Sequence, residues 1–397
     1  MSEEQKTALR NVRILTAAQS LGGANAAIVI SLGGLAGQQL ASDPALATLP
    51  VSLLNLGLAL GTLPAAATMR RFGRRAGYLL GSSIGAVAGL IAMIGIVQAS
   101  FVVFCIGTFA AGFYSSYVQS YRFAAADGLI GTERDKAISR VMVGGLIAAV
   151  IGPQLVIWTR DAVPGHHFAG SFLGQAVLAI LAVPILLTLR QPARVKAGPV
   201  ETGGARPLSQ ILTTPRFLLA LATGVVSYGL MTFVMTAAPM AMVGHGHTVD
   251  AAALGIQWHI LAMYGPSFVT GRLMARFGKE RVAAVGLLLI GASAVTELSG
   301  VAIANFWGGL ILLGVGWNFG FVGATAMVAD CHDPAERSKV QGANDFMVFG
   351  TVACASFFSG SLLHSSGWTT INWLVLPAVA FILVPLVWRA ARLPKFA

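Results

Sequence analysis

Long apolar runs separated by short polar segments recur along the whole 397-residue chain. Each run is about 20 residues or longer, which is the length that an α-helix needs to cross the hydrocarbon core of a bilayer. The pattern predicts an all-α membrane protein with twelve transmembrane helices, near residues 14–38, 45–69, 76–97, 101–126, 137–159, 168–189, 217–243, 251–275, 282–303, 305–329, 340–363 and 370–390.

One polar segment is much longer than the others and divides the chain. Residues 190–216, "RQPARVKAGPVETGGARPLSQILTTPR", are rich in Pro, Gly and basic side chains, which is typical of a linker. We expect a cytoplasmic linker here, between an N-terminal six-helix half (1–189) and a C-terminal six-helix half (217–397).

The two predicted halves share sequence at an almost constant offset. "MRRFGRR" at 69–75 aligns with "MARFGKE" at 274–280, and "ADGLIGTERDKAISR" at 126–140 aligns with "ADCHDPAERSKVQGA" at 329–343. Self-similarity of this kind indicates an internal structural repeat, as many transporters have. Each matched pair falls on a polar loop after corresponding helices, so the halves are predicted to be pseudo-symmetric.

Composition and charge agree with a membrane protein and exclude a nucleic-acid partner. The chain is 56% hydrophobic and 10% charged, with a mean hydropathy of +0.75. Although the net charge is +11, all but Arg122 and Arg160 of the 26 Lys and Arg fall on one side of the predicted helices. By the positive-inside rule this side is the cytoplasm, and both termini lie there. The basic charge is therefore explained by topology.

Twelve helices in two repeated halves, with a basic loop between helices 2 and 3, resemble the major facilitator superfamily. Its signature, roughly GxxxDRxGRR, is approximated by "ATMRRFGRR", with Arg70 at the usual Asp position and Ala275 there in the second copy. The resemblance implies a transporter whose halves alternate access. It also implies conformational roles for loop residues Arg71, Gly73, Arg74, Arg276 and Gly278, with Asp127 and Asp330 at neighbouring helix ends taking part in the acid-to-base contact.

Soft donor atoms stand out on the seventh and eighth predicted helices. Met231 and Met235 form an MxxxM pair, and His259 and Met263 form an HxxxM pair at similar depth. A spacing of four places both side chains on one helix face. Thioethers select Cu(I), and imidazole also suits copper. The pattern predicts a copper site, although methionines also fill gaps between membrane helices.

MxxxM in helix 7 followed by HxxxM in helix 8 resembles the CcoA-type bacterial copper importers. The resemblance implies import of copper, as a transported substrate and not a prosthetic group, for assembly of cbb-type haem-copper oxidases. A cytoplasmic copper chaperone is the partner that this function implies. Met242, His245 and His247, near the outer end of helix 7, are candidates for collecting the metal at the outer mouth.

Three charged residues within predicted helices are candidates for coupling or gating: Arg122, Glu297 and Asp345. Ionisable side chains inside a membrane usually face a cavity or a partner. Arg122 can also pair with Asp127, a purely structural role. Asp345 is the better cavity candidate, since helix 9, which carries Glu297, is often peripheral in this fold.

The leading interpretation is a copper importer of the bacterial cytoplasmic (inner) membrane that works by alternating access. The alternatives are an importer of riboflavin or another organic solute, a proton-driven drug exporter, and a copper sensor that moves no metal. The exporter is suggested by "GGLIAAVIGP", which ends at Pro153 and resembles the glycine-rich motif of facilitator antiporters. No recognisable catalytic constellation is present, so an enzyme is not expected.

Overall fold

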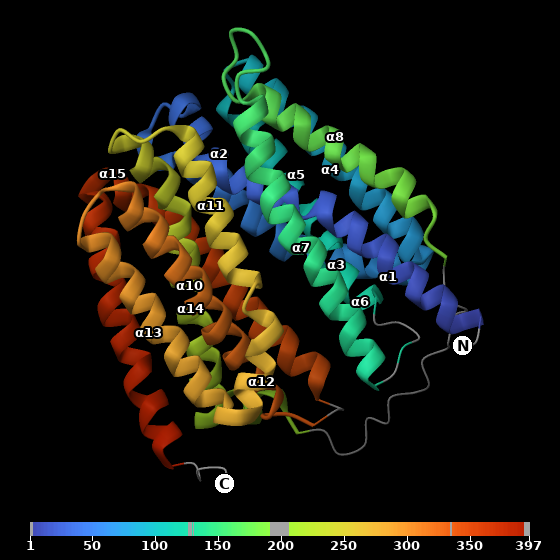
Figure 1. The fold of residues 1–397 in the computed structure, drawn as a ribbon, viewed down its shortest axis with the longest axis vertical. Coiled ribbons are helices and arrows are strands. Elements are labelled where there is room, and N and C mark those ends of the chain that lie inside the picture. The colour runs from blue at the N-terminus through green and yellow to red at the C-terminus, as the bar shows by residue number, and fades with distance from the viewer. Residues whose placement is uncertain (1–2, 126–128, 130, 191–205, 334–335, 393–397) are drawn as a thin grey trace. The chain divides into compact units, whose positions relative to one another are not determined.

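The computed structural model describes residues 3–125, 129, 131–190, 206–333 and 336–392, which form helices and connecting turns without a strand (Figure 1). Two compact units are distinguished by their internal contacts. The first comprises Met1–Arg194 and Met242–Leu261, and the second comprises Val195–Ala241 and Ala262–Ala397. The predicted domain boundaries at 189 and 217 stay a prediction, since contacts assign Met242–Leu261 to the first unit.

The first unit is built from the helices coloured blue to green in Figure 1. Within it, α4 packs on α5 and α8, α3 packs on α5, and α1 and α2 pack on α7. Its helices are α1 (Glu3–Gly22), α2 (Ala24–Leu40), the short η1 (Pro44–Leu46), α3 (Leu49–Phe72), α4 (Arg74–Val97), α5 (Phe101–Gln119), α6 (Tyr121–Ala125), α7 (Gly131–Thr159) and α8 (Ala169–Leu187).

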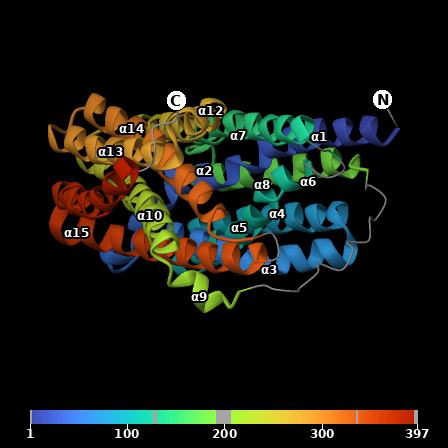
Figure 2. The same cartoon turned by 90° about the horizontal axis from the view of Figure 1, so that it is seen from below.

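The second unit contains α9 (Leu208–Leu212), α12 (Ser267–Phe277), α13 (Lys279–Leu298), α14 (Ile303–Ala329) and α15 (Arg337–Arg392). Two further helices, α10 (Pro215–Gly244) and α11 (Val249–Tyr264), contribute residues to both units. The main packing is of α13 against α14 and α15, and Figure 2 shows α13 and α14 side by side.

The predicted twelve-helix, all-α architecture is confirmed. Ten helical segments of the described chain are long and apolar enough to span a membrane. One of them, Lys339–Ala391, holds two spans, because Gly367 breaks α15 with φ of 77°. The remaining predicted span is interrupted: α11 ends at Tyr264 and α12 begins at Ser267, so neither piece alone reaches the length of a span.

The repeated loop sequence adopts the same backbone conformation in each unit. Gly73 ends α3 with φ 85° and ψ 162°, and Gly278 ends α12 with φ 90° and ψ 152°. The Gly73 N–H donates to Met69 O at 3.0 Å, and the Gly278 N–H donates to Met274 O at 2.9 Å. A positive φ is easy only for glycine, so both copies of the repeat require it at this turn.

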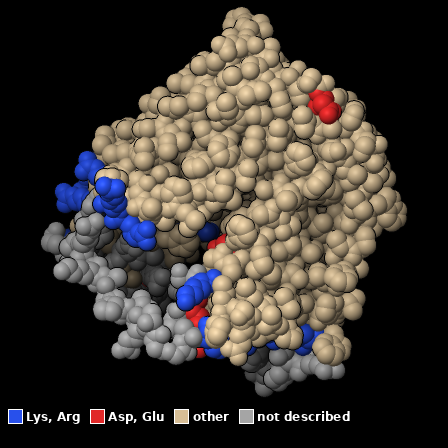
Figure 3. Space-filling view, turned by 180° about the vertical axis from the view of Figure 1, so that it is seen from behind, with Lys and Arg blue, Asp and Glu red and all other residues tan. Residues whose placement is uncertain are grey.

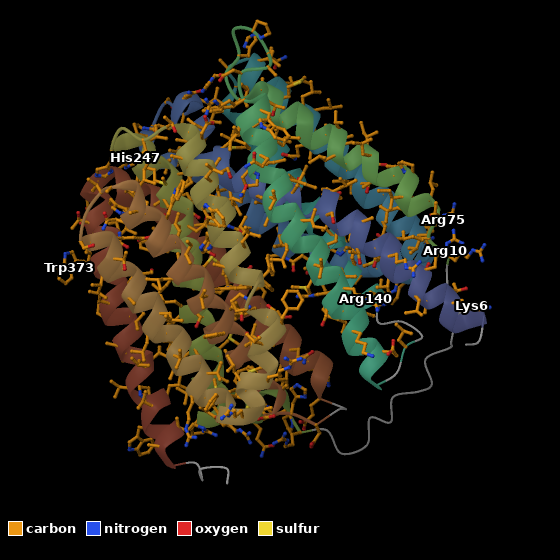
Figure 4. All side chains as sticks on the ribbon, in the orientation of Figure 1. Lys6, Arg10, Arg75, Arg140, His247 and Trp373 are labelled. Carbon is orange, nitrogen blue, oxygen red and sulfur yellow. The ribbon has the colours of Figure 1, made fainter. Side chains whose placement is uncertain are left out.

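Several basic side chains of the first unit lie near one end of its helices. In the first unit, Lys6, Arg10, Arg75 and Arg140 all lie on the side of the N-terminus, and His247 lies away from them (Figure 4). Seen from behind, most of the visible surface is tan, and the blue Lys and Arg side chains form one group at the left and others near the bottom (Figure 3). Uncharged helix surface bordered by basic ends is what a bilayer requires.

Candidate functional site

The four residues predicted to bind copper are on the expected helices, and all are buried. Met231 and Met235 are one turn apart on α10, and His259 and Met263 are one turn apart on α11. In the described residues, no group of three or more His, Cys, Asp and Glu is placed to hold a metal ion. The burial of the four predicted ligands is also expected for side chains that simply pack between helices.

Met263 lies at the break between α11 and α12, where its backbone is stabilised by a side chain from α14. Asn318 Nδ2 donates to Met263 O at 2.7 Å and to Ser267 Oγ at 2.7 Å, while Thr270 Oγ1 donates to Asn318 Oδ1 at 2.6 Å. A membrane helix can be interrupted only where other groups satisfy the freed backbone atoms. Asn318 was not predicted, although an Asn inside an apolar run is itself a signal.

A group of aromatic rings, which the sequence did not reveal, lies in the second unit. This aromatic cluster comprises Tyr228 of α10, Trp317 and Phe321 of α14, and Phe349 of α15. Tyr228 makes edge contacts with all three, at centroid distances of 5.3, 4.9 and 5.8 Å, and Trp317 stacks on Phe321 at 5.4 Å. These are favourable aromatic geometries.

The aromatic cluster is suited to receive a flat ring system. Tyr228, Phe321 and Phe349 are half-buried, so their surfaces are not fully used in packing. Trp317 is only 7% exposed, and its indole Nε1 is buried with no hydrogen-bond partner among the described residues. A buried donor without an acceptor is costly, and an acceptor on a bound solute would remove that cost. Stacking faces beside one fixed donor therefore favour a planar, heteroaromatic ligand.

Asp345 lies one helical turn before Phe349 on α15, so both are on the same face of that helix. The Asp345 side chain is exposed, and its Oδ1 accepts a hydrogen bond from Asn344 Nδ2 at 3.2 Å. The sequence singled out Asp345 for coupling or gating. The structure places this carboxylate on the face of α15 that carries part of the aromatic cluster.

The other two charged candidates have different surroundings. Arg122, in α6, places its guanidinium 4.8 Å from the ring centroid of Phe123, and its buried Nε has no partner in the described chain. The predicted alternative partner, Asp127, lies outside the described residues. Glu297, near the end of α13, is buried against Gly309 of α14. Neither Arg122 nor Glu297 belongs to the aromatic cluster.

The predicted outer-mouth residues do not share one environment. His245 is exposed and His247 is half-buried in the turn after α10, whereas Met242 is completely buried. A thioether inside the packed helix end cannot collect an ion from the medium. Of the three predicted outer-mouth residues, only the two histidines are accessible from the surface.

The conformational loop residues form contacts at the ends of their helices. Arg71 and Arg276 stack on the neighbouring rings of Phe72 and Phe277, at 5.2 and 5.3 Å. Arg74 Nη1 donates to the Tyr78 hydroxyl at 3.4 Å.

Asp330 accepts from Lys279 Nζ at 2.6 Å and from Arg216 Nη2 at 3.1 Å. An acid-to-base contact thus exists between the end of α14 and the loop after α12, although the usual signature Asp is missing.

The glycine-rich segment that suggested an exporter has a packing role in α7. A Cβ at Gly144 would lie 2.4 Å from Thr16 O of α1, and a Cβ at Gly152 would lie 2.7 Å from Ala27 Cβ of α2. Small residues are required where membrane helices approach this closely. The motif is explained by close contact of α7 with α1 and α2, without an export function.

Comparisons with known proteins agree on the family. The family model of the Major Facilitator Superfamily matches residues 14–295 and 261–396. Riboflavin transporter RfnT of Brucella anthropi is 67% identical over 385 residues, which cover 96% of each chain. The uncharacterized MFS-type transporter YddS of Bacillus subtilis is 30% identical, covering 98% of this chain and 92% of the relative. A crystal structure of nucleoside transporter NupG matches the fold with a TM-score of 0.73, at 14% identity, over 95% and 99% of the two chains.

These comparisons overturn the copper assignment. Copper as the transported substrate, metal binding, oxidase biogenesis and the CcoA-type identification conflict with 67% identity to a riboflavin transporter. The error has a physical origin. Four soft donors on two apolar helices are a short pattern that ordinary packing also produces, and here all four are buried. Identity of 67% over 385 residues rests on far more positions than these four.

The twelve-helix fold, the family match and the relatives all describe a multi-pass membrane transporter and not an enzyme. The chain belongs to the major facilitator superfamily.

Proposed function

We propose that this protein imports riboflavin across the bacterial cytoplasmic membrane. The observation that carries the proposal is the 67% identity to riboflavin transporter RfnT over 96% of both chains. At this level of identity, most side chains around a buried site are expected to be the same. The sequence-based alternative of a riboflavin importer is thereby favoured over the leading interpretation.

The aromatic cluster supplies chemistry that suits riboflavin. The isoalloxazine ring of riboflavin is flat, conjugated and rimmed by hydrogen-bond acceptors, and stacking on aromatic side chains is favourable at the distances seen here. Tyr228 and Phe349 offer ring surface, while Trp317 Nε1 can donate to a ring nitrogen or carbonyl oxygen. The exposed Asp345 can accept hydrogen bonds from ribityl hydroxyls, or it can carry a coupling proton.

Transport would proceed by alternating access of the two six-helix halves, 1–189 and 217–397, joined by the 190–216 linker. The distribution of Lys and Arg supports a cytoplasmic location for both termini and the basic loops. Arg122 and Asp345 are then proposed to act in coupling or gating. The ion pair of Asp330 with Lys279 would hold one conformation at the cytoplasmic end.

Uptake of labelled riboflavin by a bacterial riboflavin auxotroph tests the proposal. Cells that express the chain should accumulate riboflavin over time at a low external riboflavin concentration. They should also grow without a high riboflavin supplement. Cells with the empty vector should do neither. Copper content, measured on the same cells, should equal that of the empty vector. Absence of riboflavin uptake at confirmed membrane expression would overturn the proposal.

A control variant separates the site from general folding. Trp317→Leu removes both the stacking surface and the indole donor, so uptake should fall strongly. Trp373→Leu changes a side chain that is 60% exposed on α15 and points away from the bundle (Figure 4). Its uptake should match that of the unmodified protein. Equal loss in both variants would argue against the aromatic cluster as the binding site.

A further inference from the structure

An apolar groove of about 350 Å³ lies between α12, α13 and α14 in the second unit. Its walls are apolar except for one guanidinium, and its lining residues are Leu273, Phe277, Arg281, Val282, Val285 and Phe319. Phe277 is 44% exposed and Val285 is 46% exposed, so the groove opens on the surface of the helix bundle. An exposed apolar surface of this kind in a membrane-spanning chain is suited to contact with lipid.

The position of the groove along the helices is defined by Gly278. This glycine joins the end of α12 to the start of α13 in one of the two repeated basic loops. With the proposed orientation, these loops are cytoplasmic, so the groove runs from the cytoplasmic interface into the inner leaflet. This step rests on the topology and does not depend on which solute is transported.

Two guanidiniums bracket Phe277, the groove residue nearest to the loop. Arg276 Cζ lies 5.3 Å from the Phe277 ring centroid, and Arg281 Nη1 donates to Phe277 O at 3.5 Å. Neither makes an ion pair with a carboxylate in the described part of the chain. The other charges of the loop are already paired: Lys279 with Asp330 at 2.6 Å and Glu280 with Arg389 at 3.6 Å. The groove therefore ends at an uncompensated positive charge.

We propose that this groove binds one anionic phospholipid of the cytoplasmic leaflet. An acyl chain lies along Val282, Val285 and Phe319, and the phosphate sits between Arg276 and Arg281. Guanidinium groups hold phosphate oxygens through paired N–H donors. A zwitterionic lipid carries a cationic ammonium group beside its phosphate, whereas phosphatidylglycerol carries only the negative phosphate. The two arginines therefore favour the anionic lipid, and no carboxylate in the described part of the chain is ion-paired with them. Each cation near the membrane surface raises the affinity for an anionic lipid about fivefold.

Spin-labelled lipids test the proposal on the full-length protein in phosphatidylcholine vesicles. The electron paramagnetic resonance spectrum separates lipid immobilised on protein from bulk lipid, and it is compared for labelled phosphatidylglycerol and labelled phosphatidylcholine. The unmodified protein should prefer phosphatidylglycerol. The double variant Arg276→Gln/Arg281→Gln should lose this preference, by about fivefold for each arginine. Arg71→Gln/Arg75→Gln removes the same charge from the corresponding loop of the first unit and should retain the preference.

A second pair of variants tests the groove without changing charge. Val285→Trp fills the groove and should abolish the preference, whereas Val295→Trp, at a 56% exposed position further along α13, should not. An unchanged preference in the double arginine variant would overturn the proposal. Loss in the arginine variant but not in Val285→Trp would mean that the loop attracts headgroups without a groove site, which also overturns it. A changed oligomeric state of Val285→Trp would assign the groove to a protein partner instead.

Discussion

Arg206 holds both carboxylate oxygens of Glu336. Its Nε and its backbone N–H each donate to Oε1 at 2.8 Å, and its Nη2 donates to Oε2 at 2.7 Å. The Asp333 N–H donates to Oε2 at 3.0 Å, and the Glu336 side chain is only 3% exposed. Arg206 precedes α9, and Glu336 precedes α15. This bidentate pair therefore ties the chain before α9 to the connection between α14 and α15.

Glu336→Gln should lower the melting temperature at neutral pH by several degrees, because it removes the charge of a buried carboxylate that accepts hydrogen bonds from Arg206 and from the Asp333 N–H. Hydrogen bonds from Arg206, and then the Asp333 N–H, lower the pKa of Glu336 to about 2. In the unfolded chain, the pKa of a Glu side chain is about 4.3. Because folding lowers the pKa of Glu336, its contribution to stability is fully present above a pH of about 4.3 and is lost as the pH falls towards about 2. Thermal unfolding followed by fluorescence from pH 7 to pH 2.5 should show this loss in the unmodified protein.

The control for that prediction is Glu133→Gln. Glu133 pairs with Lys136 at 2.8 Å, but both side chains are at least half exposed. Exposed pairs contribute little to stability, so the melting temperature should hardly change. Equal effects of Glu133→Gln and Glu336→Gln would contradict the role given to Arg206.

Gly309→Ala should destabilise the second unit, and Gly308→Ala should not. A Cβ at Gly309 would lie 2.3 Å from Glu297 Cγ and 2.4 Å from Oε1, whereas a Cβ at Gly308 would meet only Thr296 Cγ2, at 3.6 Å. Overpacking of this kind costs about 1–3 kcal/mol, while Ala otherwise favours a helix over Gly. Melting temperatures of the purified variants in one detergent compare the two sites. A Gly309→Ala protein as stable as Gly308→Ala would mean that Glu297 moves freely.

The sequence predicted the fold well because a bilayer leaves few choices. Runs of apolar residues had to be helices, and the repeated "RFG" segments predicted equivalent loops that the structure confirms at Gly73 and Gly278. The interruption between Tyr264 and Ser267 was not predicted. It depends on Asn318, which is 51 residues from Ser267 and satisfies the broken backbone from another helix. Such long-range compensation leaves no local pattern.

The aromatic cluster was not predicted, for the same reason. The rings of Tyr228, Trp317 and Phe349 come from three helices, and no spacing in the sequence links them. Each of the two methionine-containing pairs, by contrast, lies within a single helix and is visible in the sequence. They were interpreted as a copper site, although packing between helices is enough to explain their burial. A local motif shows which side chains share one face of a helix. A solute site, by contrast, is formed by residues that are distant in the sequence.

Met231→Leu and Met235→Leu should leave riboflavin uptake close to that of the unmodified protein. Exchange of Met for Leu conserves volume and apolarity, and usually costs less than about 1.5 kcal/mol. Copper per cell, measured by mass spectrometry at low external copper, should be the same for both variants, the unmodified protein and the empty vector. Copper accumulation that requires Met231 would contradict this prediction and would support copper, and not riboflavin, as the transported solute.

Trp317→Phe should raise the KM for riboflavin about tenfold, because one hydrogen bond is lost while a stacking ring remains. The maximal rate should change little. Trp373→Phe, an exposed position on α15, is the matched control and should change neither parameter. Quenching of flavin fluorescence by the purified protein provides an independent binding measurement. If the two variants have the same KM and the same quenching, Trp317 does not contact the solute.

Asp345→Asn separates coupling from binding. If Asp345 carries a coupling proton, the amide variant cannot take up or release that proton, but it can still bind riboflavin and exchange it. Reconstituted vesicles should therefore show riboflavin exchange between the two sides, no accumulation in response to an imposed pH gradient, and no effect of an uncoupler. The unmodified protein should accumulate riboflavin and lose that accumulation with the uncoupler. Loss of exchange together with accumulation would instead assign the Asp345 carboxylate to the solute, as an acceptor for ribityl hydroxyls beside the ring of Phe349. Unchanged accumulation would exclude both roles, because binding of the solute and transfer of the coupling proton each require the carboxylate that this variant lacks.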